Sequence, residues 1–521
     1  MTAQASIRPY LNQAYLLGLL MVAVGLTLSP FMMGMSQFWL VLVWLVDGIV
    51  AKDFKQKLSR FWHNKAAVLL VAFYLMHVVG LLWTSDFQYA LKDLRVKLPI
   101  LVMPFVLSSM EPLDRKRFDF VMLIYVLAVF IATQFSFVSY LRHDYEDVRE
   151  ISHFISHIRF CLNIVFSMAV VGYYLTLKTA WWSKAIQVAL LLWFTYQVFI
   201  FESLSGYVIL VAVVLATAVY AFLQWKKSRA WHIAVGAVAL AVLVIGIMVI
   251  AHFVKPLLKV EPVDFAALEK TTAQGNPYWH DTVYNPVEDG KYVGLYYCKK
   301  EMQEAWSQRS GLPFDGLTTN GESLEATLAR YLTSKDLRKD AQGVMALTDE
   351  DIQNIEQGVA NYNNWKHPGL HARLSSTLFE YNLYRRFNNP NGGSLSQRLE
   401  YTRASFHIIG QHPWFGVGTG DVPQAFAQTY DEIHSPLKEE YRFRAHNQYL
   451  AIAVAFGLVG LAFFLFVLFY PWFASKHNHT YLFMVFLCVM LLSMFPEDTL
   501  ETQAGATLFA FFVSLLLFAK K

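Results

Sequence analysis

The sequence has little charge for its length. Of its 521 residues, 16% are Asp, Glu, Lys or Arg, while 55% are hydrophobic, and the mean hydropathy is positive. Soluble globular proteins carry about 25% charged residues, so a soluble globular fold of this size is excluded. The net charge of +4 is small and gives no indication of nucleic-acid binding.

Cysteine is also scarce. Cys161 and Cys488 lie inside apolar runs, and Cys298 stands alone in a polar region. Cysteines spaced in this way provide neither a disulfide framework nor a zinc site. The chain also lacks internal repeats and low-complexity tracts.

Long apolar runs are the dominant feature that is present. A helix needs about 20 apolar residues to cross the ~30 Å hydrocarbon core of a membrane. The fourth run, residues 98–110, is short and contains Pro104. A re-entrant or interfacial element is therefore the alternative to a membrane span there. No small-residue cleavage site follows the first run, which we expect to be a retained helix and not a signal peptide. We predict an all-α, polytopic membrane protein with about twelve spans, at residues 14–34, 36–50, 66–84, 98–110, 119–140, 158–177, 184–202, 205–223, 232–254, 447–472, 479–495 and 503–519.

Basic residues alternate between successive loops. Every second loop is rich in Lys and Arg, which is typical of the cytoplasmic loops of membrane proteins. These loops are KDFKQKLSRFWHNK, DRKRFD, LKTAWWSK, QWKKSRA, SKHNHT and the terminal KK. Both termini are therefore expected in the cytoplasm. The basic residues of DFQYALKDLRVKLP, before the fourth span, are the one departure from the alternation.

This orientation places one large polar region on the outer side. Apolar residues recur there at helical spacing, and Thr348 is expected to cap a helix whose first turn is acidic. A loop of this length is usually functional, and we expect it to cover a cavity at the membrane surface. The expected domains are a bundle of nine spans over 1–254, a large helical domain over 255–445, and the last three spans over 446–521.

One histidine lies where the polar region returns to the membrane, in the stretch FRAHNQYLAIAVAFGLVGLAFF. His446 is a candidate general base, a candidate metal ligand, or an interfacial side chain without a chemical role. A metal site is disfavoured because no spacing of the HExxH type is nearby. Arg444 and Asn447 are expected to orient a ligand beside it.

Three arginines are candidates for binding phosphate. Arg159 falls at the outer end of the sixth span, where the alternative is a side chain that reaches toward lipid head groups. Arg398 and Arg403 precede the return to the membrane. Because the planar guanidinium matches phosphate oxygens bidentately, arginines near a histidine suggest a phosphate or diphosphate ligand.

The glycine-rich segment GVGTGD, residues 416–421, has only a superficial likeness to a phosphate-binding loop. It lacks the lysine of a P-loop and follows no predicted strand. A tight turn between two helices is the favoured interpretation. Gly416 and Gly418 are retained as supporting residues of the site.

The segment RLEYTRASFHIIGQHPWFGVGTGDVPQAF, followed by AHNQYLAIAVAFGLVGLAFF, resembles the O-antigen ligase family. This superfamily comprises O-antigen ligases, polysaccharide polymerases and protein O-oligosaccharyltransferases. The resemblance implies an enzyme of the bacterial inner membrane whose large loop is periplasmic. It also implies an undecaprenyl-diphosphate-linked glycan as donor and a hydroxyl group of lipid A-core, of another glycan or of a protein as acceptor, with no metal or other cofactor.

Residue roles follow from the resemblance by motif. His446 matches the essential histidine, Arg398 matches the arginine before the glycine-rich segment, and Arg403 is its neighbour. One departure concerns ESLSGY, where Leu204 stands in place of an arginine of the family. We expect Arg159 to supply that positive charge.

The implied reaction is an inverting transfer. His446 would deprotonate the acceptor hydroxyl while Arg159 and Arg398 stabilise the leaving diphosphate. A glycan polymerase shares this donor chemistry, and the sequence does not distinguish a polymerase from a ligase. A flippase or other transporter is less favoured, because the repeat symmetry and interrupted helices typical of transporters are not evident.

Overall fold

The structure is a computed structural model. It describes residues 3–519 apart from 143–147, 225–232, scattered positions between 234 and 258, Gly392, and 475–479. The chain forms two compact units. The first comprises residues 1–243, 401–434 and 442–521, and the second comprises 244–400 and 435–441.

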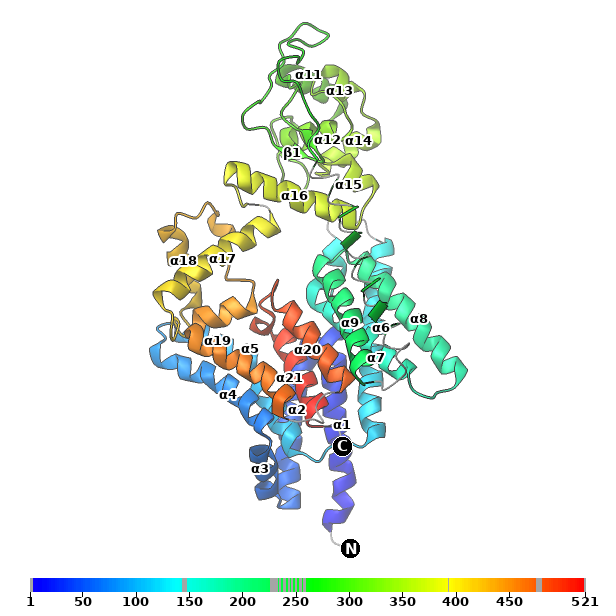
Figure 1. The fold of residues 1–521 in the computed structure, drawn as a ribbon, viewed down its shortest axis with the longest axis vertical. Coiled ribbons are helices and arrows are strands. Elements are labelled where there is room, and N and C mark those ends of the chain that lie inside the picture. Colours follow the sequence, from blue (N-terminus) through cyan, green and yellow to red (C-terminus); the bar gives the residue numbers. More distant parts are fainter. Residues whose placement is uncertain are drawn as a thin grey trace. The chain divides into compact units, whose positions relative to one another are not determined.

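The first unit is a bundle of apolar helices (Figure 1). Short 3-10 turns connect some of them: η1 (Gly80–Trp83), η2 (Val148–Ile151) and η4 (Thr499–Glu501). The helices are α1 (Ala3–Leu28), α2 (Pro30–Ala51), α3 (Phe54–His63), α4 (Lys65–Val79), α5 (Phe87–Ser109), α6 (Arg115–Arg142), α7 (His157–Leu175), α8 (Trp181–Ile200), α9 (Leu204–Gln224), α18 (Val422–Glu432), α19 (Gln448–Ala474), α20 (Tyr481–Ser493) and α21 (Gln503–Leu517).

Eight helices in the described part of the chain are long and apolar enough to cross a membrane. They lie in α1, α2, α4 with η1, α6, α7, α8, α9 and α19, which confirms a helical, multi-pass architecture. The expected spans at 98–110, 479–495 and 503–519 correspond to parts of α5 and to the shorter apolar helices α20 and α21. The expected span at 232–254 falls largely outside the described residues, so the total of twelve stays a prediction.

The expected boundary between the first two spans, near residue 35, is wrong. The first helix ends at Leu28, and α2 begins at Pro30. Proline has no N–H to donate and is favoured at the start of a helix. The Ser29 side chain also accepts a hydrogen bond from the N–H of Met32 at 3.2 Å, which caps the new helix.

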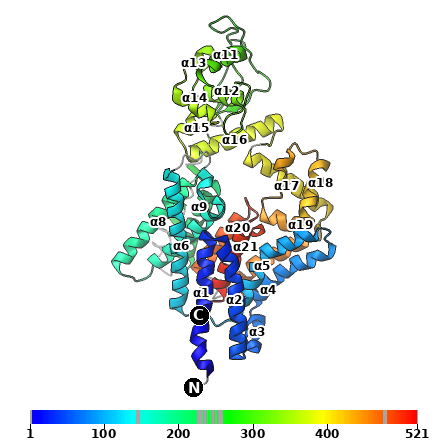
Figure 2. The ribbon, with the colours of Figure 1, turned by 180° about the vertical axis from the view of Figure 1, so that it is seen from behind.

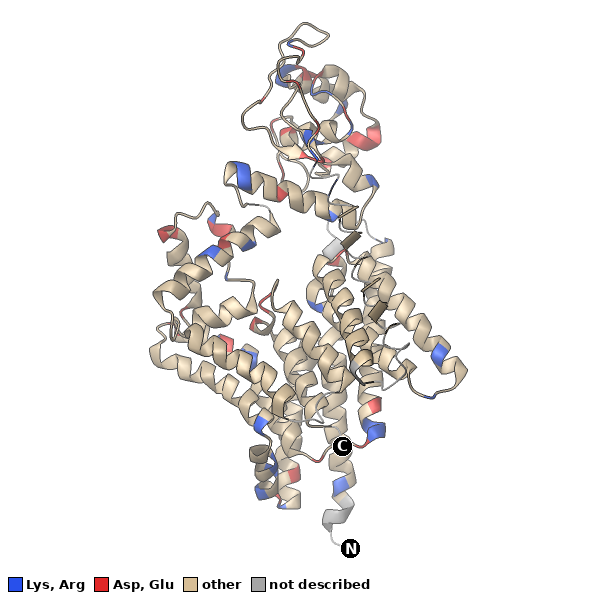
Figure 3. Ribbon diagram, viewed as in Figure 1, with Lys and Arg blue, Asp and Glu red and all other residues tan. Residues whose placement is uncertain are grey.

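Helix α4 packs against both α5 and α19, and α5 packs against α21 (Figure 2). Charged residues are few along α4, α19 and α21, whereas the first half of α5 carries Lys92, Asp93, Arg95 and Lys97 (Figure 3). Aromatic rings fill the neighbouring core, where Phe166 lies 4.7 Å from Phe512 and 4.9 Å from Phe486 between ring centroids. The bundle therefore supplies a rigid support for the segments that connect its helices.

Helix α19 is interrupted at Gly457, whose φ is +66°. The glycine-rich segment is hydrogen-bonded to this interruption: the N–H groups of Val417 and Gly418 donate to the carbonyl oxygens of Val454 and Ala455 at 3.0 and 2.9 Å. The N–H of Leu458 donates to the carbonyl oxygen of Pro413, three residues before this segment, at 2.7 Å. A break in a membrane helix frees backbone groups, and the segment satisfies them.

The second unit is a small helical domain with its own core. A hairpin of two short strands, β1 (Val287–Glu288) and β2 (Lys291–Tyr292), is its regular sheet in the described residues. Thr348 caps α14 in a reciprocal capping box with Asp351, which confirms the expected cap. The helices are α11 (Lys299–Arg309), α12 (Leu324–Ser334), α13 (Ala341–Met345), α14 (Asp349–Glu356), α15 (Tyr362–Lys366), α16 (Leu370–Phe387), the start of α17 (Ser394–Gln411) and the 3-10 turn η3 (Glu439–Tyr441).

Substituting Gly457→Ala should destabilise the protein. An added Cβ would lie 2.2 Å from the carbonyl carbon of Trp414, and the positive φ disfavours any side chain, which together cost about 1–3 kcal/mol or more. Gly172→Ala on α7 is the control, because a Cβ there meets nothing within 4 Å. Thermal unfolding in detergent should show a lower midpoint for the first variant alone, and equal midpoints would contradict the packing described for this joint.

Candidate active site

His446 lies in a strained turn directly before α19. Its φ is +44°, in the left-handed region that few residues other than glycine adopt. The next residue, Asn447, ends the turn: its Oδ1 accepts from the N–H of Leu450 at 3.0 Å, and its Nδ2 donates to the carbonyl oxygen of Phe495 at 2.9 Å. Strained backbone of this kind is concentrated at functional sites. Asn447 thus holds the histidine turn in place.

The imidazole of His446 meets both aromatic and acidic neighbours. Its ring centroid is 5.4 Å from that of the buried Tyr401 and 6.2 Å from that of Phe443. A ring nitrogen and carboxylate oxygens of Glu497 and Asp498 all lie within 4.8 Å of one another. The Nδ1 atom is buried without a hydrogen-bond partner among the described residues. An imidazole beside carboxylates is well suited to accept a proton.

Arg159 reaches the same acidic pair from the first turn of α7. Its Nη2 lies 4.0 Å from Oε2 of Glu497, and its Nη1 donates to Oγ of Ser156 at 2.8 Å. The side chain is only 15% exposed, and its Nε has no hydrogen-bond partner in the described structure. Glu497 therefore neighbours both His446 and Arg159, although these two residues are far apart in the sequence.

The start of α7 also lies beside the segment where α8 ends and α9 begins. Phe160 packs its ring against Phe201 with centroids 5.3 Å apart, and a Cβ added at Gly206 would lie 3.5 Å from the Cβ of Cys161. This segment includes Leu204, where the family resemblance implies an arginine. Arg159 is thus on the neighbouring helix, as its expected replacement role requires.

Several groups of the protein form contacts with the guanidinium of Arg444. Its Nε lies 2.5 Å from Oδ2 of Asp498, and its guanidinium also donates to the hydroxyl of Tyr89 at 3.3 Å and to the carbonyl oxygen of Glu501 at 3.4 Å. Burial opposes its charge, but Asp498 and Glu501 outweigh burial and raise the pKa of Arg444 above its ordinary value. Arg444 is therefore engaged in fixing the histidine turn.

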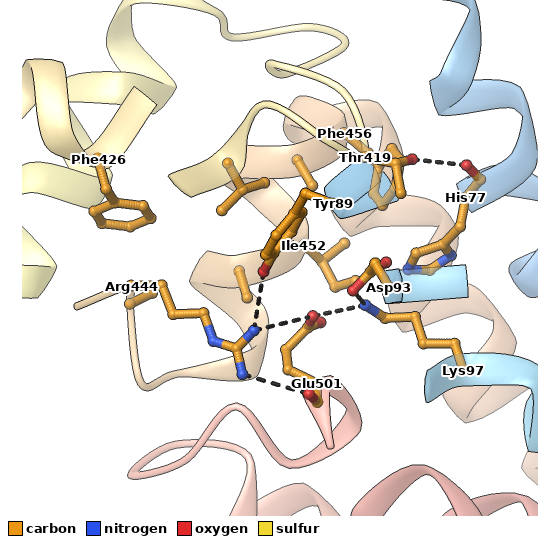
Figure 4. A pocket seen from close by; sticks show the side chains of 14 residues that line it. His77, Tyr89, Asp93, Lys97, Thr419, Phe426, Arg444, Ile452, Phe456 and Glu501 are labelled. Atoms are coloured by element: carbon orange, nitrogen blue, oxygen red, sulfur yellow. Dashed lines mark hydrogen bonds and ion pairs between the residues drawn. The ribbon is translucent and has the colours of Figure 1, made fainter. Parts of the chain in front are cut away.

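Glu501 joins this turn to α5. Its carboxylate accepts from Nζ of Lys97 at 2.6 Å and from Nε2 of Gln448 at 3.0 Å, and Lys97 is also paired with Asp93 (Figure 4). The Lys97 side chain is 2% exposed. Burial alone would raise the pKa of Glu501, but Lys97 and Arg444 hold that pKa below its ordinary value. The carboxylate is therefore ionised between two cations.

The other expected site residues have different surroundings. Arg398 is half-buried in the part of α17 that belongs to the second unit, and Arg403 is exposed in the part that belongs to the first. Gly416 and Gly418 pack against the interruption of α19, where a Cβ on Gly416 would lie 2.4 Å from the carbonyl carbon of Ala455. The structure thus gives these glycines a packing role, and their role in the site stays a prediction.

Sequence reasoning did not single out four charged residues of this region. Glu497, Asp498 and Glu501 lie in PEDTLE, a short acidic segment between the last two expected spans. Lys97 lies in the amphipathic segment of α5. The available signal was the presence of ionisable groups so close to apolar helices, because such groups are rare and usually paired or functional.

The His446, Glu497 and Asp498 atoms form a set that could hold a metal ion. Two guanidinium groups already occupy these carboxylates and would compete with a metal ion for them. Arg444 is paired with Asp498, and Arg159 lies near Glu497. A divalent cation would share its carboxylates with both of them, which opposes its binding by like-charge repulsion. Metal independence stays a prediction.

Removing the Glu501 charge should destabilise the fold strongly. Glu501→Gln leaves Lys97 and Arg444 with less compensation in a poorly hydrated region, which costs about 3–5 kcal/mol when a buried pair is broken. Glu111→Gln is the control, because its ion pair with Arg8 is exposed and is worth at most about 1 kcal/mol. Denaturation monitored by tryptophan fluorescence would disprove the bracing role of Glu501 if both variants unfolded alike.

The site falls partly within a segment that matches a known family. Residues 369–465 match the family model described as O-antigen ligase. This segment includes Arg398, Arg403, Arg444 and His446. No curated protein matches the chain. The resemblance noted from the sequence is confirmed over residues 369–465, where the chain is similar to the O-antigen ligase family.

Proposed function

We propose that this protein transfers a glycan from undecaprenyl diphosphate to an acceptor hydroxyl, with lipid A-core as the acceptor. The family match supports a membrane glycosyltransferase of the O-antigen ligase or polymerase type. The observation that carries the proposal is the strained His446 beside Glu497 and Asp498, with Arg159 next to the same acidic pair. We infer that the site opens on the periplasmic side of the inner membrane, with both termini in the cytoplasm.

The acceptor hydroxyl would be activated by His446. The imidazole takes the hydroxyl proton as the oxygen attacks the anomeric carbon, and Glu497 and Asp498 stabilise the imidazolium that forms. The bond between the anomeric carbon and the diphosphate oxygen breaks, and its electron pair leaves with the diphosphate. Attack from the opposite side inverts the anomeric carbon.

The leaving diphosphate would be bound by arginine. Arg159 is the best placed candidate, because its charge has only a long contact with Glu497 and its Nε has no hydrogen bond to the described protein. A guanidinium with unused donors can form paired hydrogen bonds with phosphate oxygens. Arg398 and Arg403 are proposed to contribute from α17.

Reconstitution of the full-length protein tests the reaction and its acceptor. Proteoliposomes would receive the undecaprenyl-diphosphate-linked glycan with lipid A-core, with a second lipid-linked glycan, or with a protein acceptor. Free undecaprenyl diphosphate and glycosylated lipid A-core are expected. A lengthened lipid-linked glycan would make the enzyme a polymerase, and a glycosylated protein would make it an oligosaccharyltransferase. Glycan movement across the bilayer without bond transfer would contradict the enzyme proposal and favour a transporter.

His446→Asn should lower the rate of transfer by at least about 10²-fold, because it removes the base. Asparagine tolerates the left-handed backbone, so thermal stability should be preserved. His434→Asn is a matched control: this histidine is exposed and has a similar φ of +48°. Equal turnover by both variants would show that His446 is not the base.

Arg159→Lys should weaken donor binding more than it slows the chemical step. Lysine keeps the charge but loses the planar fork, so KM for the lipid-linked donor should rise about tenfold or more. Arg117→Lys on α6 is the control, since that arginine pairs with Asp114 at 3.6 Å on the protein surface. An unchanged KM for the donor would remove Arg159 from the proposed diphosphate site.

A further inference from the structure

A second pocket in the first unit lies among the ends of four helices. It has a volume of about 630 Å³, compared with the roughly 30 Å³ that one water molecule occupies in the liquid. Residues Arg60 and His63 from α3, Asn64, Lys65 and Ala66 at the start of α4, Tyr470 and Ala474 from α19, and Leu517 and Phe518 at the end of α21 line this pocket.

The polar side of this pocket is basic. Among the described residues, the ion-pair contact of Arg60 is a long one of 3.7 Å with Asp53, a carboxylate that also lies 3.9 Å from Lys57. Lys65 is exposed and forms no ion pair with the residues that the structure describes. None of the described residues that line the pocket is acidic. A positive charge therefore remains available to an anion.

The other side of the pocket is apolar and lies beside an amphipathic helix. Leu517 and Phe518 are joined there by Ala66 and Ala474. On α3, Phe61 is buried whereas Trp62 is 65% exposed. Tryptophan favours the membrane interface, and a helix with one apolar and one basic face is typical of a membrane surface. The pocket thus offers both a basic and an apolar surface at this depth.

This pocket and the candidate active site lie at opposite ends of α19. His446 precedes the first residue of α19, and Ala474 is its last. The part of α19 that follows its interruption at Gly457, residues 458–474, is about 25 Å long, which is close to the ~30 Å hydrocarbon thickness. The blue segments of α3 in Figure 3 mark the basic loop expected on the cytoplasmic side. The pocket is therefore separate from the glycan site.

We propose that this pocket binds the head group of an anionic phospholipid. Arg60 and Lys65 would contact the phosphate, the Tyr470 hydroxyl would donate to it, and the apolar residues would contact the upper acyl chains. Basic pockets between membrane helices on the cytoplasmic side recognise such head groups. The proposal goes beyond glycan transfer and does not depend on it.

Native mass spectrometry of the delipidated full-length protein tests this proposal. Phosphatidylglycerol or phosphatidylcholine would be titrated into detergent micelles of the wild type and of the double variant Arg60→Gln with Lys65→Gln. The wild type should prefer phosphatidylglycerol, and the double variant should bind it at least about tenfold more weakly, since each basic residue adds to the attraction. Lys55→Gln with Lys116→Gln is the matched control, because both lysines are exposed outside the pocket.

Two further arms keep the test decisive. Lys65→Glu alone changes one exposed residue, so it should fold normally and still lose the preference for phosphatidylglycerol. Inorganic phosphate should not displace the lipid at equal concentration, and displacement would overturn the lipid assignment in favour of a free phosphate. Undiminished lipid preference in the folded pocket variants, or an equal loss in the control, would overturn the proposal.

Discussion

The structure around the candidate site depends on keeping one carboxylate, Glu501, charged at the edge of an apolar bundle. Ionised groups are costly to remove from water unless they are paired and fully hydrogen-bonded. Lys97 approaches Glu501 from α5, Arg444 approaches from the histidine turn, and Gln448 approaches from the first turn of α19. Because each partner comes from a different segment, satisfying this carboxylate also brings these segments together.

The histidine turn is held by contacts on both sides of His446. On the N-terminal side of His446, Arg444 is paired with Asp498. On its C-terminal side, Asn447 caps α19. A left-handed histidine persists only where its surroundings determine the backbone, and these contacts provide that constraint. The imidazole is thus positioned before any substrate arrives, which is what efficient proton transfer requires.

Hydropathy was sufficient to predict most of the membrane helices, and the cap at Thr348 was predicted from its neighbours alone. The helix break at Pro30 was missed because the apolar pattern continues through it. His446 and Arg159 were identifiable as single residues, but their shared neighbour Glu497 was not, because periodicity reports local faces and not distant pairs. The same limit applies to Lys97, whose charge departs from the alternation of basic loops. Its pairing with Glu501 could not be predicted, because Glu501 is remote in sequence.

The hydrogen bonds between the glycine-rich segment and α19 also have a consequence for chain length. They join Val417 to Val454 and Gly418 to Ala455, so the chain between them, including His446, forms a closed loop without a covalent crosslink. The entropic cost of closing a loop grows only slowly with the number of residues in it. Insertions and deletions inside this loop should therefore be tolerated at exposed positions such as His434, whereas shifting the register at either end would displace the histidine.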